Sequence, residues 1–325
     1  MGRRIFQDNV KMKSIKQCEV CGSNNIKSLF KQYDKNLNIK KYFYISKCKN
    51  CLASFLNPQP EYKELEEHYL KDKYYSLKNI ETKESKKTRL KLKLYNIYFN
   101  SNRNNLLLKT IFSPIKFIVR GTNLTKGNKL LDVGCGSGQF LYEMKELGME
   151  VQGVEPGDFN EEENKKYSLN IKKSNLIDAK YKKESFDLIT INHVLEHLDN
   201  PHETLIEINK ILKKDGKLII AIPNTNSLAY WIFKKNWYQL DVPRHIINYS
   251  NKNIKLILEK NGFKIKRTRY NSRPSQFVVS LYFSFNIKKR IKPLNYALDI
   301  LFLPLTWLVN FLRMGDQIEV WCEKK

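Results

Sequence analysis

The sequence predicts an α/β fold in which helices cover both faces of a mostly parallel sheet. Short apolar strand patterns alternate with helix patterns from residue 129 onward, which is typical of such a sheet. A glycine-rich bend joins the first of these strands to the first helix, as in many ligand-binding α/β domains. The chain has 325 residues, 42% of them apolar, so we expect a second, smaller unit beside the main domain.

The elements of the main domain follow one another in regular alternation. We expect strands at residues 129–133, 151–154, 186–191, 217–222, 263–269 and 318–322. Helices are expected among them, at residues 139–147, 160–167, 202–213 and 252–261. An apolar insertion at about 274–315 separates the last two strands.

Four of the six cysteines form two C-x-x-C pairs near the N-terminus. The pairs are Cys18 with Cys21 and Cys48 with Cys51, separated by 26 residues. Each pair can supply two thiolates from one turn, and a closed set of four thiolates predicts a structural zinc site. Paired thiols of this kind indicate a reducing compartment, so we expect a cytoplasmic location. We divide the chain into a zinc-ribbon-like module (1–60), a helical linker (61–127) and the main domain (128–325).

Three alternating glycines, Gly134, Gly136 and Gly138, follow Asp132 at the end of the first strand of the main domain. A dinucleotide fingerprint requires G-x-G-x-x-G, but Gln139 stands where its third glycine would be. Glu155 ends the second strand, where a carboxylate can accept hydrogen bonds from both hydroxyls of a ribose. Asn192 follows the strand at 186–191 and is delivered to the same crevice. The pattern predicts a nucleoside site without phosphates.

These motifs occur in a characteristic order: D-V-G-C-G-S-G, G-V-E-P, F-D-L-I and V-L-E-H-L. Residues from Lys129 to about Phe263 thereby resemble class I S-adenosyl-L-methionine-dependent methyltransferases. The resemblance implies a Rossmann-like, seven-stranded sheet and S-adenosylmethionine as the cofactor. It implies that the cofactor is held by Asp132, Gly134, Gly136, Gly138 and Glu155, and that its adenine lies near Asn175.

Methyl transfer to a hydroxyl requires a base, for which histidine has a suitable intrinsic pKa. The candidates are His193, His197 and His245, and we favour His245 with Arg244 as an anion clamp for the substrate. A purely structural role for His245 is the alternative. The H-x-x-E-H run at 193–197 also matches a zinc-protease pattern, which we reject because the run directly follows a buried strand. His68 and His202 are expected at the surface.

The acceptor is expected to be a small molecule or glycan. The cysteine pairs, Asn57-Pro58-Gln59-Pro60 and Pro243-Arg244-His245 resemble a bacterial subfamily that modifies sugars and cell-surface glycans. The resemblance implies a nucleotide- or lipid-linked sugar in polysaccharide biosynthesis, with methylation at oxygen, nitrogen or carbon left open.

Two other function classes compete with this expectation. The first is an RNA methyltransferase that binds RNA through the zinc module and a basic surface, because 58 Lys and Arg face 33 Asp and Glu for a net charge of +25. The run at 192–195 lacks the N-P-P-aromatic element that resembles base-amino methyltransferases, so nucleic acid is the less favoured partner. A genome-wide bias toward Lys is another explanation of the charge. The second class is a non-catalytic binding module, which the intact glycines and Glu155 disfavour.

The apolar insertion at 274–315 allows two interpretations. Its second half, 294–312, is almost long enough to span a bilayer but contains Asn295, Asp299, Pro304 and Asn310. We favour a helical cap over the substrate pocket. The alternative is peripheral docking of residues 277–313 on the anionic inner face of a membrane, helped by flanking Lys and Arg.

Overall fold

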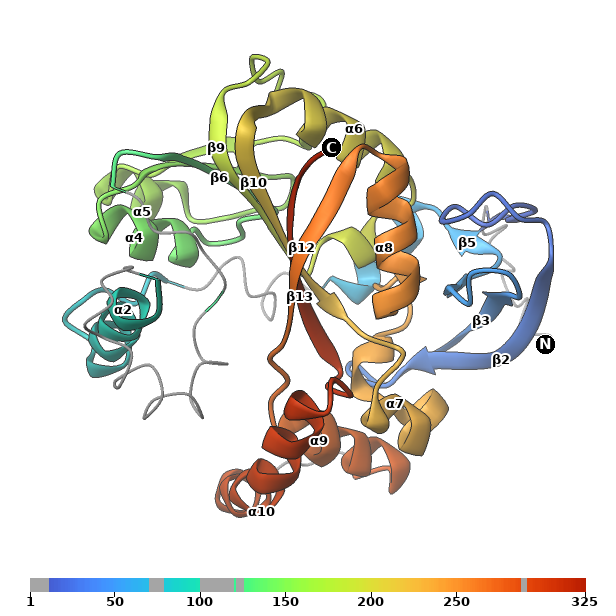
Figure 1. Cartoon of the computed structure of the whole chain (residues 1–325). Coiled ribbons are helices and arrows are strands. Elements are labelled where there is room, and N and C mark those ends of the chain that lie inside the picture. The colour runs from blue at the N-terminus through green and yellow to red at the C-terminus, as the bar shows by residue number, and fades with distance from the viewer. Residues whose placement is uncertain (1–11, 70–78, 100–119, 121–125, 288–290) are drawn as a thin grey trace, which may run out of the picture.

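A seven-stranded sheet forms the centre of the molecule, in a computed structural model that describes residues 12–69, 79–99, 120, 126–287 and 291–325. The strands run in the order β12-β13-β10-β9-β6-β7-β8 (Figure 1). Their bounds are β6 (Lys129–Val133), β7 (Glu150–Glu155), β8 (Asn170–Lys173), β9 (Phe186–Asn192), β10 (Leu212–Pro223), β12 (Phe263–Tyr270) and β13 (Gln317–Lys324). Neighbouring strands from β10 to β8 are parallel, and β13 is antiparallel to both β10 and β12. This is the Rossmann-like, mostly parallel sheet that the sequence predicted.

Helices pack on both faces of this sheet, as expected. They are α2 (Lys86–Phe99), α4 (Gln139–Glu146), α5 (Glu161–Lys166), α6 (Pro201–Ile211) and α8 (Asn251–Lys260). Successive side chains of a strand point to opposite faces, so Leu130 packs in one apolar cluster with Leu141 of α4. Leu131 packs in the other cluster with Leu205 of α6 and Ile257 of α8. The carboxyl ends of the parallel strands are thereby fixed by two cores.

The N-terminal region forms a second, four-stranded sheet. Its strands are β2 (Ile26–Asp34), β3 (Ile39–Cys48), β4 (Ser54–Leu56) and β11 (Ile247–Asn248), in the order β11-β4-β3-β2. The strand β11 belongs to the main domain by sequence, and it pairs with β4 through Ile247 and Phe55. A short pair, β1 (Met12–Lys13) with β5 (Gln59–Pro60), adjoins this sheet. The predicted boundary at residue 60 therefore falls between regions that share a sheet.

The described part of the predicted helical linker contains three helical segments. These are α1 (Tyr62–Leu65), a 3-10 turn η1 (Glu66–His68) and α2, while residues 70–78, 100–119 and 121–125 of that prediction lie outside the described residues. The expectation that His68 is exposed is wrong, because its ring is buried and its Nδ1 lies 2.8 Å from Asp34 Oδ2. His202 is half-buried and its Nε2 donates to the carbonyl of Glu19 at 2.7 Å.

The apolar insertion forms two helices, α9 (Ser275–Ser284) and α10 (Lys292–Phe311), which gather with α7 (Leu228–Phe233) at one end of the molecule (Figure 1). Among the described residues, α10 alone has the length and apolar composition to cross a membrane, but only 11% of its most apolar stretch is buried. Two side chains of α9, Ser275 and Val279, line the cavity at the sheet edge described below. Of the two helices, α9 contributes side chains to the wall of this cavity, as a cap over the pocket would. No residue of α10 is among the wall residues.

Candidate functional site

The glycine-rich bend after β6 forms the floor of the site. Gly134, Gly136 and Gly138 have φ values of 68°, 56° and 83°, a region that side chains disfavour. A Cβ on Gly134 would lie 2.3 Å from Cγ2 of Val194, so no side chain fits at this position. Because Val133 pairs with Ile191 in the parallel ladder, Gly134 comes next to Asn192 at the end of β9.

Glu155 ends the neighbouring strand β7 and reaches this bend. Its side chain is buried, with Oε2 accepting from the N–H of Gly136 and Oε1 from the N–H of Gly157, both at 2.9 Å. Burial raises the pKa of Glu155, although these two backbone N–H groups partly offset the effect. The structure thus brings the glycine bend and the carboxylate together on one side of the sheet.

Asp132 is held beneath the bend rather than facing open space. It is 1% exposed, accepts a hydrogen bond from Oγ1 of Thr190 at 2.6 Å and pairs with the guanidinium of Arg120. The Arg120 guanidinium also stacks 3.9 Å from the centre of the Phe140 ring. Sequence reasoning missed Arg120, because it stands outside any recognisable motif.

A cavity of about 930 Å³ opens above these residues. Its walls include Gly134, Ser137 and Asn192 from the strand ends, Arg120 and Phe140 beside the bend, and all three candidate histidines, His193, His197 and His245. Gly134 and Asn192 therefore share one cavity with the candidate bases, whereas Asp132, Gly136, Gly138 and Glu155 are not among its wall residues. Asn175 is not among its wall residues: its side chain is exposed and caps a turn by accepting from the N–H of Asp178 at 2.9 Å.

His193 stands directly after β9, beside the glycine bend. Its backbone has a φ of 56°, a left-handed conformation that turns the side chain into the cavity. Nδ1 lies 3.2 Å from Oε1 of Glu196, and a carboxylate can only accept, so Nδ1 carries the proton. The lone pair of the neutral ring is then on Nε2, and the side chain remains 33% exposed.

Glu196 and His197 lie in the turn that follows, η6 (Leu195–His197). Burial alone would raise the pKa of Glu196, but the hydrogen bond from His193 and the nearby imidazoles lower it overall. Burial and the neighbouring His245 lower the pKa of His197 to about 4, so this ring is neutral at pH 7. The Nδ1 of His197 lies 3.1 Å from the hydroxyl of Tyr69.

His245 enters the cavity from the loop before β11. Its Nδ1 lies 2.8 Å from the carbonyl of Gln239, which can only accept, so Nδ1 donates this hydrogen bond. Nε2 faces two carboxylates, Oε1 of Glu196 at 3.9 Å and Oδ2 of Asp241 at 3.8 Å. His245 packs edge-on against His197, with ring centres 4.8 Å apart.

Arg244 does not have the role that the sequence suggested. All of its guanidinium N–H groups go to acceptors within the protein, on Asp34, Asp241 and the carbonyl of His68. Burial would lower the pKa of Arg244, but the two carboxylates raise it overall. With no free donor, this side chain ties the N-terminal sheet to the loop that carries His245 and is not an anion clamp.

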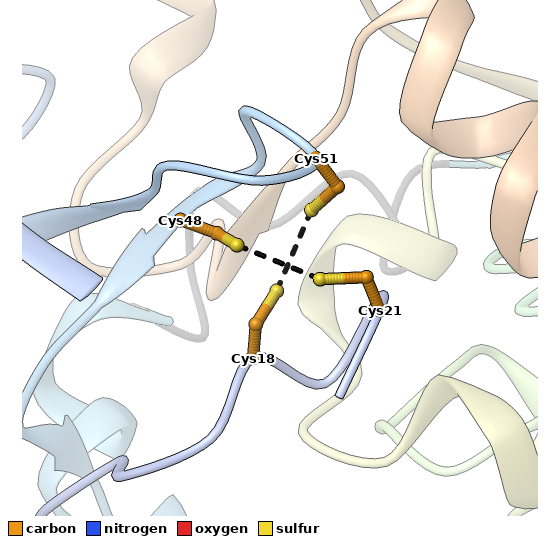
Figure 2. A group of neighbouring side chains, drawn as sticks. All are labelled: Cys18, Cys21, Cys48 and Cys51. Atoms are coloured by element: carbon orange, nitrogen blue, oxygen red, sulfur yellow. Dashed lines mark hydrogen bonds between the residues drawn. The ribbon is translucent and has the colours of Figure 1, made fainter. Parts of the chain in front are cut away.

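The four predicted metal-ligating cysteines converge at one point (Figure 2). Sγ of Cys18 lies 3.6 Å from Sγ of Cys51, and Sγ of Cys21 lies 3.5 Å from Sγ of Cys48. Tetrahedral Zn–S bonds of about 2.3 Å place sulfurs roughly 3.8 Å apart, close to these separations. The hydrogen bond from Cys51 lowers the pKa of Cys18 to about 5, which favours a thiolate. The donor set and its spacing fit zinc.

A second cavity, of about 1040 Å³, adjoins the first at Asn36 and Leu37, which line both. The aromatic rings of Tyr33, Tyr42 and Phe283 line this cavity. Four lysines stand around it: Lys31, Lys35, Lys40 and Lys235. Burial lowers the pKa of Lys35, and the charges of Lys235 and Lys40 add to that effect. This basic groove runs from the cavity at the sheet edge toward the end of α9.

Comparison with known proteins gives matches over the main domain. A family model described as a methyltransferase domain matches residues 102–268, just over half of the 325 residues. The ubiquinone biosynthesis O-methyltransferase of Glaesserella parasuis is 31% identical over 135 residues, which are 38% of this chain and 57% of that protein. The protein of the same name from Maricaulis maris is 27% identical over 198 residues, 55% of this chain and 76% of that protein.

These matches leave part of each protein outside the alignment. The chain covers 57% and 46% of the length of two of the curated relatives, from Glaesserella parasuis and Saccharophagus degradans. Among solved structures, a SAM-dependent methyltransferase from Archaeoglobus fulgidus has 23% sequence identity and a TM-score of 0.43, over 71% of this chain and 98% of that one.

Proposed function

Because the chain belongs to the methyltransferase-domain family, we propose that it transfers the methyl group of S-adenosylmethionine to a hydroxyl of a small-molecule or glycan acceptor. The observation that carries the proposal is the single cavity lined by Gly134 of the glycine bend, Asn192 and three histidines, with Glu155 hydrogen-bonded to the N–H of Gly136 in that bend. The curated relatives, named as O-methyltransferases, favour oxygen as the acceptor atom.

The residues at the bend fit the cofactor. Gly134 lines the cavity with its backbone alone, and the carboxylate of Glu155 can accept hydrogen bonds from ribose hydroxyls. S-adenosylmethionine, when bound, supplies a methyl group activated by the positive charge on its sulfur. Asn192, at the end of β9, comes next to Gly134 in the sheet, and His193 is the next residue in the chain. Both line the cavity, so we place the acceptor on the His193 side of the bend.

His193 is the base that the geometry favours. Its Nδ1–H is held by Glu196, and its Nε2 can accept the proton of an acceptor hydroxyl in the cavity. His245, which the sequence favoured, is 7% exposed and directs Nε2 toward Glu196 and Asp241 instead. The side chain beside the cofactor bend is the better placed of the two.

The basic groove supports an acceptor that carries phosphate, such as a nucleotide- or lipid-linked sugar. Its lysines adjoin the catalytic cavity at Asn36 and Leu37, so one molecule can place phosphate near Lys40 and Lys235 and a hydroxyl near His193. Purified protein should therefore methylate such sugars when supplied with labelled cofactor. If the label enters only RNA, the acceptor assignment is wrong and the RNA alternative is correct.

We infer that the four cysteines bind one structural zinc ion. All of the ligand positions are occupied by protein sulfur, and Cys18 and Cys48 are almost fully buried, which leaves no position for a substrate. The ion would hold the turn before β2 against the turn after β3. It would therefore stabilise the sheet that β11 completes.

Replacing Glu155 with glutamine should weaken cofactor binding by about 1–3 kcal/mol, because charge-assisted hydrogen bonds to the ribose are lost. In the wild type, binding should also weaken as the pH falls. The carboxylate is needed in its charged form, and a raised pKa means that protonation begins above the ordinary value of 4.5. Calorimetry with S-adenosylhomocysteine across this range measures both effects.

The matched control is Glu150→Gln on the same strand, where the glutamate is exposed. It should leave both the affinity and its pH dependence unchanged. Equal affinities for the wild type and Glu155→Gln at every pH would remove Glu155 from the cofactor site.

We also propose that α10 docks on an anionic bilayer. Its exposed apolar residues recur at helical spacing on one face: Tyr296, Ile300, Leu301, Trp307, Leu308 and Phe311. Lys292 and Arg313 flank this face, and the lysines of the basic groove lie near the end of α9. Asn310 bonds to the backbone of Ser272, and Asn295 accepts from Tyr282, so α10 is tied to the domain along its length. These ties favour a helix in the interface over one that spans the bilayer.

Changing Ile300, Leu301 and Phe311 together to serine should reduce co-sedimentation with phosphatidylglycerol vesicles by at least about tenfold, since each buried apolar side chain contributes about 1.5–3 kcal/mol. The control is Ile206→Ser on α6, which is 59% exposed and lies outside the insertion. Unchanged vesicle binding by the triple variant would exclude α10 as the docking surface. Loss of self-association without any wild-type vesicle binding would assign the face to a second copy of the chain.

A further inference from the structure

Glu196, His197 and His245 form a cluster that the proton transfer to His193 does not use. One ligand atom from each residue lies within 4.8 Å of the others. Glu196 is 1% exposed and His245 is 7% exposed, so the cluster lies deep in the wall of the cavity. Two imidazoles and one carboxylate are a donor set that divalent first-row metal ions favour.

In each of the two imidazoles, one nitrogen is engaged by a neighbouring group, which leaves the other nitrogen available to bind a metal. Nδ1 of His245 donates to the carbonyl of Gln239, and Nδ1 of His197 contacts the hydroxyl of Tyr69. Metal-bound histidines usually have their second nitrogen held in this way, because the outer hydrogen bond fixes the orientation of the ring. Nε2 of His245 then faces the carboxylate of Glu196 across 3.9 Å.

Among the described residues, only one of the two carboxylate oxygens of Glu196 has a hydrogen-bond donor. Oε1 accepts from His193, but Oε2 is buried and has no hydrogen-bond partner. A buried carboxylate oxygen without a donor or a cation is costly. Asp241, the other nearby carboxylate, is already paired with Arg244 and accepts from Asn36, so Glu196 is the one in need of positive charge.

We propose that Glu196, His197 and His245 bind one divalent transition-metal ion in the wall of the catalytic cavity. Three protein ligands leave coordination positions open toward the cavity, where an oxygen of the acceptor can bind. In that position the metal orients the acceptor and lowers the pKa of its hydroxyl, while His193 takes the proton. This role for the metal rests on the proposed methyl transfer, but the binding of the metal does not.

Manganese binding to the full chain with its cysteine site loaded with zinc tests the proposal. Mn²⁺ prefers nitrogen and oxygen ligands over thiolates, and its electron paramagnetic resonance signal reports free ion directly. The wild type should bind a single Mn²⁺ per chain. Glu196→Gln and His245→Gln should each weaken that binding by at least about tenfold. The control His202→Asn should retain the wild-type affinity within about threefold, because His202 contacts Glu19 and Asn261 and lies outside the ligand set.

Thermal unfolding and calorimetry with S-adenosylhomocysteine verify that each variant is folded. No saturable Mn²⁺ binding in the wild type, or equal binding in wild type and Glu196→Gln, would overturn the proposal. Cofactor binding without Mn²⁺ binding would leave the methyltransferase assignment intact and exclude the metal. Mn²⁺ binding with the expected ligand dependence but no cofactor binding would support the metal site and overturn the methyltransferase assignment.

Discussion

Replacing Cys48 with serine is expected to release the zinc and disorder the N-terminal sheet while leaving the cofactor bend intact. Cys48 is fully buried at the end of β3 and lies 3.5 Å from Cys21. Structural zinc contributes about 10–16 kcal/mol to the folding of isolated zinc-finger peptides, so loss of one thiolate has a large effect. Metal analysis should give a zinc content near zero.

The same substitution should separate acceptor turnover from cofactor binding. The N–H of Leu56 in the cysteine-bearing sheet donates to the carbonyl of Ile246, directly after His245. Arg244 joins Asp34 of this sheet to Asp241 of the loop. Disordering the sheet should therefore displace the loop and lower kcat by at least about tenfold, whereas affinity for S-adenosylhomocysteine should change by less than about threefold.

A cysteine outside the cluster provides the control for this experiment. Cys322 is buried in β13, and Cys322→Ala should retain zinc although it costs some stability. Full zinc content in Cys48→Ser would show that the cluster is not a zinc site. Full zinc loss with unchanged kcat would show that the sheet does not support the acceptor loop.

The main sheet could be predicted from the sequence because its strands are buried apolar runs. The strands β6 and β9 and the second half of β10 are mostly buried, and such runs are typical of parallel sheets with two covered faces. The strand β8 escaped prediction because Asn170-Ile171-Lys172-Lys173 has one apolar residue and lies at the sheet edge. An exposed edge strand carries little periodic signal.

The sequence could not predict which polar residues pair with one another. The sequence suggests Arg244 as an anion clamp for the substrate, but its carboxylate partner Asp34 lies 210 residues away in the chain. His68 is expected at the surface from the sequence, but the structure buries it against that same Asp34. A hydrogen bond between distant segments leaves no local pattern, so the choice among candidate bases depends on the fold.

Replacing His193 with asparagine is expected to lower kcat by about 10²–10⁴-fold, the usual contribution of a positioned general base. Asparagine is suitable because the backbone at this position has a φ of 56°, which asparagine tolerates better than most residues. Its amide can still donate to Glu196 but cannot accept a proton at pH 7. Affinity for S-adenosylhomocysteine should remain within about threefold of wild type, since Gly134 and Glu155 are unchanged.

Two further measurements identify the base rather than a general disturbance of the cavity. Added imidazole should restore part of the activity of His193→Asn, because the cavity of about 930 Å³ has room for a free ring beside the missing one. The control His202→Asn removes a histidine that contacts Glu19 and Asn261 outside the cavity, and its kcat should stay within about threefold of wild type. If His193→Asn also keeps its kcat within about threefold of wild type, His193 is not the base.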